Sequence, residues 1–308
     1  MVSVGVDIGG MSAKIALVKD GKIISRTSVK AIKGERYLYE IASAIERLIA
    51  RKNLTKNDIA SIGVGCPGAV TSSTGVVEFS SNLKWNKMPV GKILSEQLGM
   101  PVKVCNDANV ATYGEAIYGA GKKYNTVIML TLGTGVGGGI VIDKKLYEGN
   151  GSKAGEVGHT TLVLGGEKCN CGRSGCCEAY VSASALIRDT KRAMLEDDKS
   201  LMWQVAKSLD GVDGTTACEC AKLGDKTAIK VYDNYANYLA ETIMNFCNIF
   251  RPEAIILGGG ISNHGKFLFE KVRKICKKNY YGYKGTPEVK IVCARLKNDA
   301  GVIGAAIL

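Results

Sequence analysis

This 308-residue chain lacks the segments that would assign it to a membrane or to the secretory route. Its first residues, MVSVGVDIGG, read as a strand entering a glycine turn and do not resemble a basic region followed by an apolar signal core. The longest stretch without charge, residues 124–142, is interrupted by glycines and threonines, which argues against a spanning helix. We therefore expect a cytoplasmic protein with no membrane partner.

Acidic residues are fewer than basic ones, 29 against 41, which gives a formal net charge of +12. Such an excess can indicate binding to nucleic acid, an anionic small substrate, or solubility alone. The lysines are dispersed, however, with no long basic arm and no ladder of aromatic residues of the kind that single-strand binders use. We interpret the charge as solubilising, with some benefit in attracting a nucleotide, and expect no nucleic-acid partner.

Histidine is scarce, with 2 residues, whereas there are 11 cysteines, an odd and scattered set that indicates reduced thiols over a disulfide framework. Cys169, Cys171 and Cys176 form a CxCGxxGC cluster that begins ten residues after His159. Three thiolates and one imidazole nitrogen are a ligand set of closed tetrahedral zinc sites, so we predict structural Zn²⁺ here. The alternative is a group of thiols packed as small hydrophobic side chains. Cys177, next to Cys176, should point away from the metal and be buried.

Hydrophobic patterning predicts an α/β protein with helices packed on a sheet. Glycine turns and polar turns separate the expected strands, and the first helix has apolar residues that recur at intervals of three and four. The expected strands of the first half are residues 2–6, 15–18, 23–27, 59–64 and 102–105, and the expected helices are residues 37–52 and 90–98.

The order strand, glycine turn, strand, turn, strand recurs over residues 126–147, with GTGVGGG as the glycine turn, and implies two similar halves. A third strand and glycine turn, AIILGGGIS, follows a long helical stretch from about residue 228 to residue 250. We place a boundary at the glycine-rich, charged segment GAGKKY. Residues 1–118 then form the first domain and residues 119–297 the second, and residues 298–308 read as a small-residue helix that packs back on the first.

Three glycine-rich turns, each after an apolar strand, are more than turn formation requires. Glycine lets backbone N–H groups approach phosphate oxygens, although each turn alone could be only a tight connection. None is a P-loop, because no GK[ST] follows. Asp7, at the end of the first strand, could hold magnesium or cap a turn. Asp107, in the segment NDAN, could by itself be only a helix cap.

Segments at both ends and in the middle of the chain resemble one family, the bacterial ROK sugar kinases of the actin-like and hexokinase-like superfamily. In chain order they are DIGGMSAK, GCPGAV, SSNLKW, NDANVATYGEAIYGAG, LTLGTGVGGG, GEVGH, CNCGRSGCCEAY, LGGGIS and DAGVIGAA. The resemblance implies two RNase H-like (actin-like ATPase) domains with a cleft between them. It also implies phosphorylation of a hexose by ATP with Mg²⁺.

The resemblance carries over residue roles by position. It makes Asp107 the base that accepts the proton of the sugar hydroxyl as that oxygen attacks the γ-phosphorus, and it implies a domain closure that excludes water. The residues implied to contact the sugar are Gly68, Asn82, Asn106, Asp107, Glu156, His159 and Glu178. The residues implied to hold the phosphates, magnesium and adenosine are Asp7, Gly9, Gly10, Ser12, Lys14, Gly133, Thr134, Gly135, Gly258, Gly259 and Gly260.

One position departs from the family pattern, because Met11 stands where the first phosphate turn usually has threonine. Loss of that hydroxyl should cost on the order of 0.5–1.5 kcal/mol and weaken nucleotide binding several-fold. Catalysis should survive, since Ser12 and the turn amides remain.

The CxCGxxGC element, GEVGH and NLKW look most like the glucokinase branch, so we predict a glucokinase that makes glucose 6-phosphate. A kinase of N-acetylmannosamine, of another N-acetylhexosamine or of another hexose would share the same motifs. A third hypothesis is a non-catalytic, sugar-responsive regulator, but family repressors carry a helix-turn-helix domain before the DIGG strand, which begins here at Val2. By analogy with the family we expect a homodimer or tetramer.

Overall fold

The structure is a computed structural model that describes residues 1–277 and 279–308. The chain divides into two compact units, of which the first comprises Met1–Asn125, Gly139–Gly155 and Arg295–Leu308. The second comprises Thr126–Gly138 and Glu156–Ala294. The expected division placed residues 1–118 and the helix at residues 298–308 in the first domain and residues 119–297 in the second, whereas the first unit also includes residues 119–125 and Gly139–Gly155.

The first unit is built on a five-stranded sheet with the order β3-β2-β1-β4-β8. β1 pairs antiparallel with β2 and parallel with β4, which in turn pairs parallel with β8. Parallel pairing brings the carboxyl ends of β1, β4 and β8 to one edge of the sheet. The strands are β1 (Val2–Ile8), β2 (Ser12–Lys19), β3 (Lys22–Lys30), β4 (Ile59–Cys66) and β8 (Val102–Asn106).

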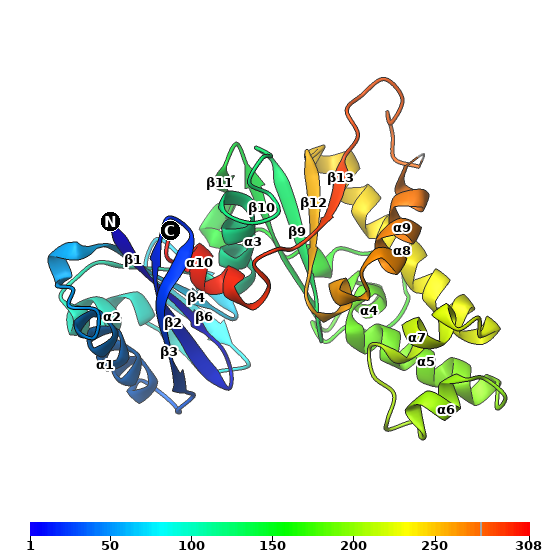
Figure 1. Cartoon of the computed structure of the whole chain (residues 1–308), viewed down its shortest axis with the longest axis horizontal. Coiled ribbons are helices and arrows are strands. Elements are labelled where there is room, and N and C mark those ends of the chain that lie inside the picture. Colours follow the sequence, from blue (N-terminus) through cyan, green and yellow to red (C-terminus); the bar gives the residue numbers. More distant parts are fainter. Residues whose placement is uncertain (278) are drawn as a thin grey trace. The chain divides into compact units, whose positions relative to one another are not determined.

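Helices cover both faces of this sheet (Figure 1). α1 (Arg36–Ala50) and α2 (Val90–Leu98) lie on one face, and α3 (Asp107–Ile117) and α10 (Ala300–Ala305) lie on the other. A separate three-stranded sheet consists of β5 (Ala69–Thr71), β6 (Val76–Ser80) and β7 (Trp85–Met88).

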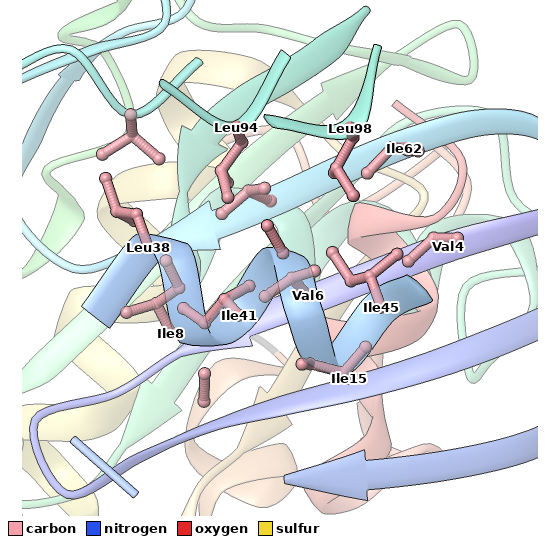
Figure 2. Packing of buried hydrophobic residues seen from close by; sticks show 14 of the residues in the cluster. Val4, Val6, Ile8, Ile15, Leu38, Ile41, Ile45, Ile62, Leu94 and Leu98 are labelled. Carbon is pink, nitrogen blue, oxygen red and sulfur yellow. The ribbon is translucent and has the colours of Figure 1, made fainter. Parts of the chain in front are cut away.

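The core of the first unit lies between α1, α2 and the sheet, as Figure 2 shows. Apolar residues recur along α1 at the spacing of one helical face, and Leu38, Ile41 and Ile45 are all fully buried. They pack in the same cluster as Val4 and Val6, which alternate with Gly5 along β1. Alternation along the strand therefore sends the large side chains to one face and leaves glycine on the other.

On the glycine face, backbone packs directly on backbone. A Cβ on Gly5 would lie 1.9 Å from the carbonyl oxygen of Val302, and one on Gly63 would lie 1.9 Å from that of Ala305. A Cβ on Gly304 would lie 1.7 Å from the carbonyl oxygen of Val110 in α3. Only glycine permits these approaches, which hold α10 against the sheet and α3 against α10.

A second five-stranded sheet has the order β11-β10-β9-β12-β13. This is the order of the first sheet with β9 in the place of β1, so the prediction of two similar halves is confirmed. β12 pairs parallel with both β9 and β13, and β10 pairs antiparallel with β11. The strands are β9 (Val127–Leu132), β10 (Val136–Ile142), β11 (Lys145–Leu146), β12 (Ala254–Gly258) and β13 (Lys290–Cys293).

The run VGGG, residues 136–139, which we expected to be part of a turn, lies in strand β10. Neighbouring atoms leave no room for a side chain at two of its glycines. A Cβ on Gly138 would lie 2.4 Å from the carbonyl oxygen of Met129, and one on Gly139 would lie 2.6 Å from the Thr112 hydroxyl. The turn proper is thus reduced to Gly133–Gly135.

The remaining helices belong to the second unit. The predicted long helix is present as α8 (Lys226–Phe250), and it begins where the Asp225 carboxylate accepts a bond from the N–H of Ala228. In the part of the chain that the structure describes, no helix is both long enough and apolar enough to span a bilayer. The other helices are α4 (Glu178–Val181), α5 (Ala183–Glu196), α6 (Met202–Ala206), α7 (Thr216–Lys222) and α9 (Lys266–Cys276).

Candidate functional site

Polar groups of the first unit gather at the edge where β1, β4 and β8 end. Asp7 on β1 lies opposite Gly65 on β4, and Cys66 lies opposite Asn106 on β8. Burial raises the pKa of the Cys66 thiol, and the negative charges of Asp107 and Asp7 raise it further. Both carboxylates therefore lie near the end of β4.

Asn106 caps the helix that Asp107 begins. Its Oδ1 accepts bonds from the N–H groups of Ala108 at 2.9 Å and Asn109 at 3.1 Å. The alternative reading of Asp107 as the cap is therefore wrong, because the extended backbone of Asn106 places that side chain at the cap and Asp107 is the first helical residue. The N–H of Ala108 also donates to the Asp107 carboxylate at 2.9 Å.

Asn106 also fixes Gly68, another predicted sugar contact. The Asn106 side-chain amide donates to the carbonyl oxygen of Gly68 at 3.1 Å. Gly68 has a φ of 111°, and a Cβ there would lie 2.2 Å from the carbonyl oxygen of Phe79. Glycine is required at this position, and its backbone lies beside the start of α3.

The predicted phosphate and magnesium residues of the first unit lie around the β1–β2 turn. Burial raises the pKa of Asp7, while the ammonium group of Lys14, 3.6 Å from its carboxylate, lowers it. A partly desolvated carboxylate of this kind suits a divalent cation, which takes oxygen ligands.

The same turn is closed by a bond from the N–H of Gly9 to the carbonyl oxygen of Ser12 at 2.9 Å. A Cβ on Gly10 would lie 3.7 Å from the carbonyl oxygen of Asn82, so Asn82 is adjacent to the turn. The Met11 side chain is 88% exposed. Methionine is therefore accommodated here without packing strain, but it supplies no hydroxyl to a phosphate.

In the second unit, the predicted phosphate turn Gly133–Gly135 is held by the start of α5. The N–H of Ala183 donates to the carbonyl oxygen of Gly133, and the hydroxyl of Ser184 donates to that of Thr134, both at 2.8 Å. Within the turn, the N–H of Gly133 donates to the carbonyl oxygen of Gly135 at 3.0 Å.

Glu178 supports the same turn from its other side. Its Oε2 accepts a bond from the N–H of Val136 at 2.9 Å, and a Cβ on Gly135 would lie 2.4 Å from that oxygen. Its Oε1 lies 3.5 Å from the Cys169 sulfur. Glu178, predicted to contact the sugar, thus lies beside both the phosphate turn and the predicted metal site.

Gly258–Gly260, the predicted adenosine segment, follows β12. Gly259 has a φ of 79°, and a Cβ there would lie 2.4 Å from the carbonyl oxygen of Leu132, the last residue of β9. A Cβ on Gly260 would meet nothing within 4 Å. The glycine segment therefore lies next to the start of the phosphate turn and leaves open space beside Gly260.

The four predicted metal ligands come together, with His159 Nδ1 3.7 Å from the Cys169 sulfur and the sulfur atoms of Cys171 and Cys176 3.6 Å apart. All four ligand atoms lie within 4.8 Å of one another. A tetrahedron with three Zn–S bonds of about 2.3 Å and one Zn–N bond of about 2.0 Å separates its ligand atoms by about 3.5–3.8 Å. The ligand set and the separations of 3.7 Å and 3.6 Å fit a zinc ion.

Cys177 is buried beside Cys176, as predicted, and its sulfur lies 3.0 Å from the Thr160 hydroxyl oxygen.

Glu156, predicted to contact the sugar, precedes the short 3₁₀ turn that carries His159. The backbone N–H of His159 donates to the carbonyl oxygen of Glu156 at 3.1 Å. The other histidine, His264, is buried and lies 2.9 Å from the Tyr232 hydroxyl, so its contacts are structural.

Two groups of residues that hold these sites were not among the predicted site residues. Arg173 donates to the carbonyl oxygen of His159 at 3.1 Å and to the Thr161 hydroxyl at 2.8 Å. Its place inside the CxCGxxGC element was a signal. Ala183 and Ser184 gave no such signal, since they lie 50 residues from the turn that they support.

The site residues thus fall into one group per unit. The first unit holds Asp7, Gly9, Gly10, Ser12, Lys14, Gly68, Asn82, Asn106 and Asp107. The second unit holds Gly133, Thr134, Gly135, Glu156, His159, Cys169, Cys171, Cys176, Glu178, Gly258, Gly259 and Gly260.

Comparison with known proteins gives consistent matches. The model of the ROK family matches residues 3–308. A glucokinase of Streptomyces coelicolor is 35% identical over 312 residues, which cover 100% of this chain and 97% of the relative. The crystal structure of a ROK family glucokinase from Streptomyces griseus in complex with glucose and AMPPNP has a TM-score of 0.81 and 32% identity, covering 100% of this chain and 98% of that one.

A xylose repressor of Caldicellulosiruptor bescii is also similar. It is 31% identical over 272 residues, which cover 88% of this chain but only 67% of the repressor. The glucokinase is thus matched over nearly its whole length, whereas a third of the repressor has no counterpart in the alignment.

We predict that Asn106→Ala lowers the free energy of unfolding by about 1 kcal/mol, because the N–H groups of Ala108 and Asn109 lose their cap. Asn106→Asp, which keeps the capping oxygen, should lose less. Urea unfolding followed by circular dichroism measures both. Equal losses in the two variants would mean that the bond to Gly68, and not the cap, carries the effect.

Proposed function

This chain belongs to the ROK family, and we propose that it is an ATP-dependent glucokinase, which transfers the γ-phosphoryl group of ATP to glucose and forms glucose 6-phosphate. The observation that carries the proposal is the position of Asp107 at the Asn106-capped start of α3, in a chain that matches a glucokinase over 97% of its length. The reaction needs one positioned base and a charged phosphate cradle.

Asp107 accepts the proton of the attacking sugar hydroxyl. The oxygen forms a bond to the γ-phosphorus as the bond from that phosphorus to the bridging oxygen of ADP breaks. Asn106 holds the start of α3, and with it the Asp107 backbone, while the rigid backbone of Gly68 approaches the ring. Positioning of this kind supplies most of the rate enhancement in phosphoryl transfer.

The phosphates of ATP bind at the glycine turns. Gly9, Gly10 and Ser12 provide the turn of the first unit, and Gly133–Gly135 that of the second, with Gly258–Gly260 beside the adenosine. Asp7 is the carboxylate that would hold Mg²⁺, directly or through water, and the ion would supply positive charge to neutralise the phosphate oxygens. Lys14 adds positive charge beside Asp7.

His159 and the three cysteines would hold zinc, which would have a structural role. With one ring nitrogen of His159 engaged in this way, the other would be left to donate to a sugar hydroxyl. Because Glu178 lies beside the same cluster, an ordered metal loop also positions this carboxylate near the sugar. Glu156 and Asn82 complete the proposed set of sugar contacts.

The function is tested by ADP release from Mg·ATP over a panel of glucose, mannose, fructose, N-acetylglucosamine and N-acetylmannosamine. We expect glucose to give the highest kcat/KM. A higher value for an N-acetylhexosamine would replace glucose as the substrate, and no turnover with any sugar would overturn the kinase and favour the regulator.

The Asp107→Asn variant should lower kcat by roughly 10² to 10⁴-fold, the usual contribution of a positioned general base, while glucose still binds. The coupled assay gives kcat, and calorimetry gives the Kd of glucose. Asp20→Asn, in the exposed β2–β3 turn, is the matched control and should keep full activity. Near-normal turnover of the Asp107 variant would rule out the role.

Removal of a zinc ligand should release the metal and weaken glucose binding, because metal binding is coupled to the order of the loop. We expect about one zinc per wild-type chain by mass spectrometry, far less in Cys171→Ser, and a glucose KM that is several-fold higher. Cys293→Ser removes an exposed cysteine outside the cluster and should change neither. A zinc-depleted Cys171 variant with an unchanged KM would separate the metal from function.

A further inference from the structure

We propose that Ser184 is a positioning residue for nucleotide binding. Its hydroxyl, together with the backbone amide of Ala183, orients the peptide planes of the turn Gly133–Gly135 toward the phosphates of the nucleotide. The inference rests on the proposed kinase function and adds a residue to which neither the family motifs nor the sequence patterns point.

Two hydrogen bonds join the start of α5 to the turn. Ala183 N–H donates to the carbonyl oxygen of Gly133, and the Ser184 hydroxyl donates to the carbonyl oxygen of Thr134, each at 2.8 Å. The Ala183 amide is one of the amides at a helix start that have no partner within the helix. Two successive carbonyl groups of the turn are therefore fixed toward the first residues of α5.

The geometry of the peptide unit determines where the N–H groups of the turn point. In a planar trans peptide, the C=O of one residue and the N–H of the next point in opposite directions. Fixing the carbonyl groups of Gly133 and Thr134 toward α5 therefore directs the N–H groups of Thr134 and Gly135 away from it. The turn thus presents two adjacent donors on one side, an arrangement that binds anionic oxygens.

The neighbouring N–H groups of this segment already have acceptors within the protein. The N–H of Gly133 donates to Gly135, and the N–H of Val136 donates to Glu178. Within residues 1–277 and 279–308, the N–H groups of Thr134 and Gly135 have no acceptor. These two N–H groups are the ones that point away from α5.

The position of Ser184 allows a clean test. Its side chain is exposed, so removal of the hydroxyl opens no cavity. The helix start has a separate cap, since the Ser182 hydroxyl accepts a bond from the N–H of Ala185 at 3.1 Å. Ser184→Ala should therefore leave α5 folded and release only the carbonyl group of Thr134.

The experiment measures binding of Mg·AMPPNP and of adenosine, which has no phosphates, to the full chain by calorimetry and competition. Loss of one neutral hydrogen bond that orients a donor predicts a Kd for Mg·AMPPNP about three- to tenfold higher in Ser184→Ala. The Kd values of adenosine and glucose should not change, and in the assay KM for ATP should rise while KM for glucose stays constant. Ser184→Thr, which keeps the hydroxyl, should restore Mg·AMPPNP binding to within about twofold of wild type.

The matched control is Ser208→Ala, which removes another exposed hydroxyl of the second unit, one bonded to the N–H of Gly211. It should leave every constant unchanged. An unchanged Kd for Mg·AMPPNP in Ser184→Ala, or an equal weakening for adenosine, would overturn the proposed role. If wild-type protein bound no Mg·AMPPNP and phosphorylated no sugar, the kinase function itself would fail, a result that is distinct from a silent Ser184 variant in an active enzyme.

Discussion

Parallel pairing of strands is the constraint on which the rest of this molecule depends. Because β1, β4 and β8 run in the same direction, residues that are about 100 positions apart in sequence, Asp7 and Asn106, arrive at the same sheet edge. β9 and β12 do the same in the second sheet and bring Gly259 beside the start of the turn at Gly133. Side chains at these edges are held in fixed positions because the hydrogen bonds of the sheet determine where each strand ends.

Much of the secondary structure and strand order could be predicted from the sequence, because short-range residue patterns determine them. The alternation of β1 and the apolar face of α1 specified both elements to within two residues, and the recurrence after residue 126 predicted the shared strand order. The grouping of His159 with the three cysteines was predictable because a loop closed on one ion needs cysteines at short spacing, and the structure places the four candidate ligand atoms within 4.8 Å of one another.

What could not be predicted depends on contacts between distant segments. The glycines after Gly135 looked like a turn, but they lie in a strand. Glycine is needed there because Met129 and Thr112 leave no room for a Cβ, and neither residue is a sequence neighbour. The cap could not be assigned between Asn106 and Asp107, since both residue types cap helices and only backbone conformation separates them. Ser184 lies 50 residues from Thr134, and no local pattern links a helix start to a remote carbonyl group.

The shared strand order gives the chain two turns of equivalent topology, one between β1 and β2 and one between β9 and β10. The second turn contains a threonine, Thr134, whereas Met11 occupies the corresponding region of the first. Because Met11 is 88% exposed, its replacement changes what the first turn offers to a ligand without disturbing the packing of the first unit.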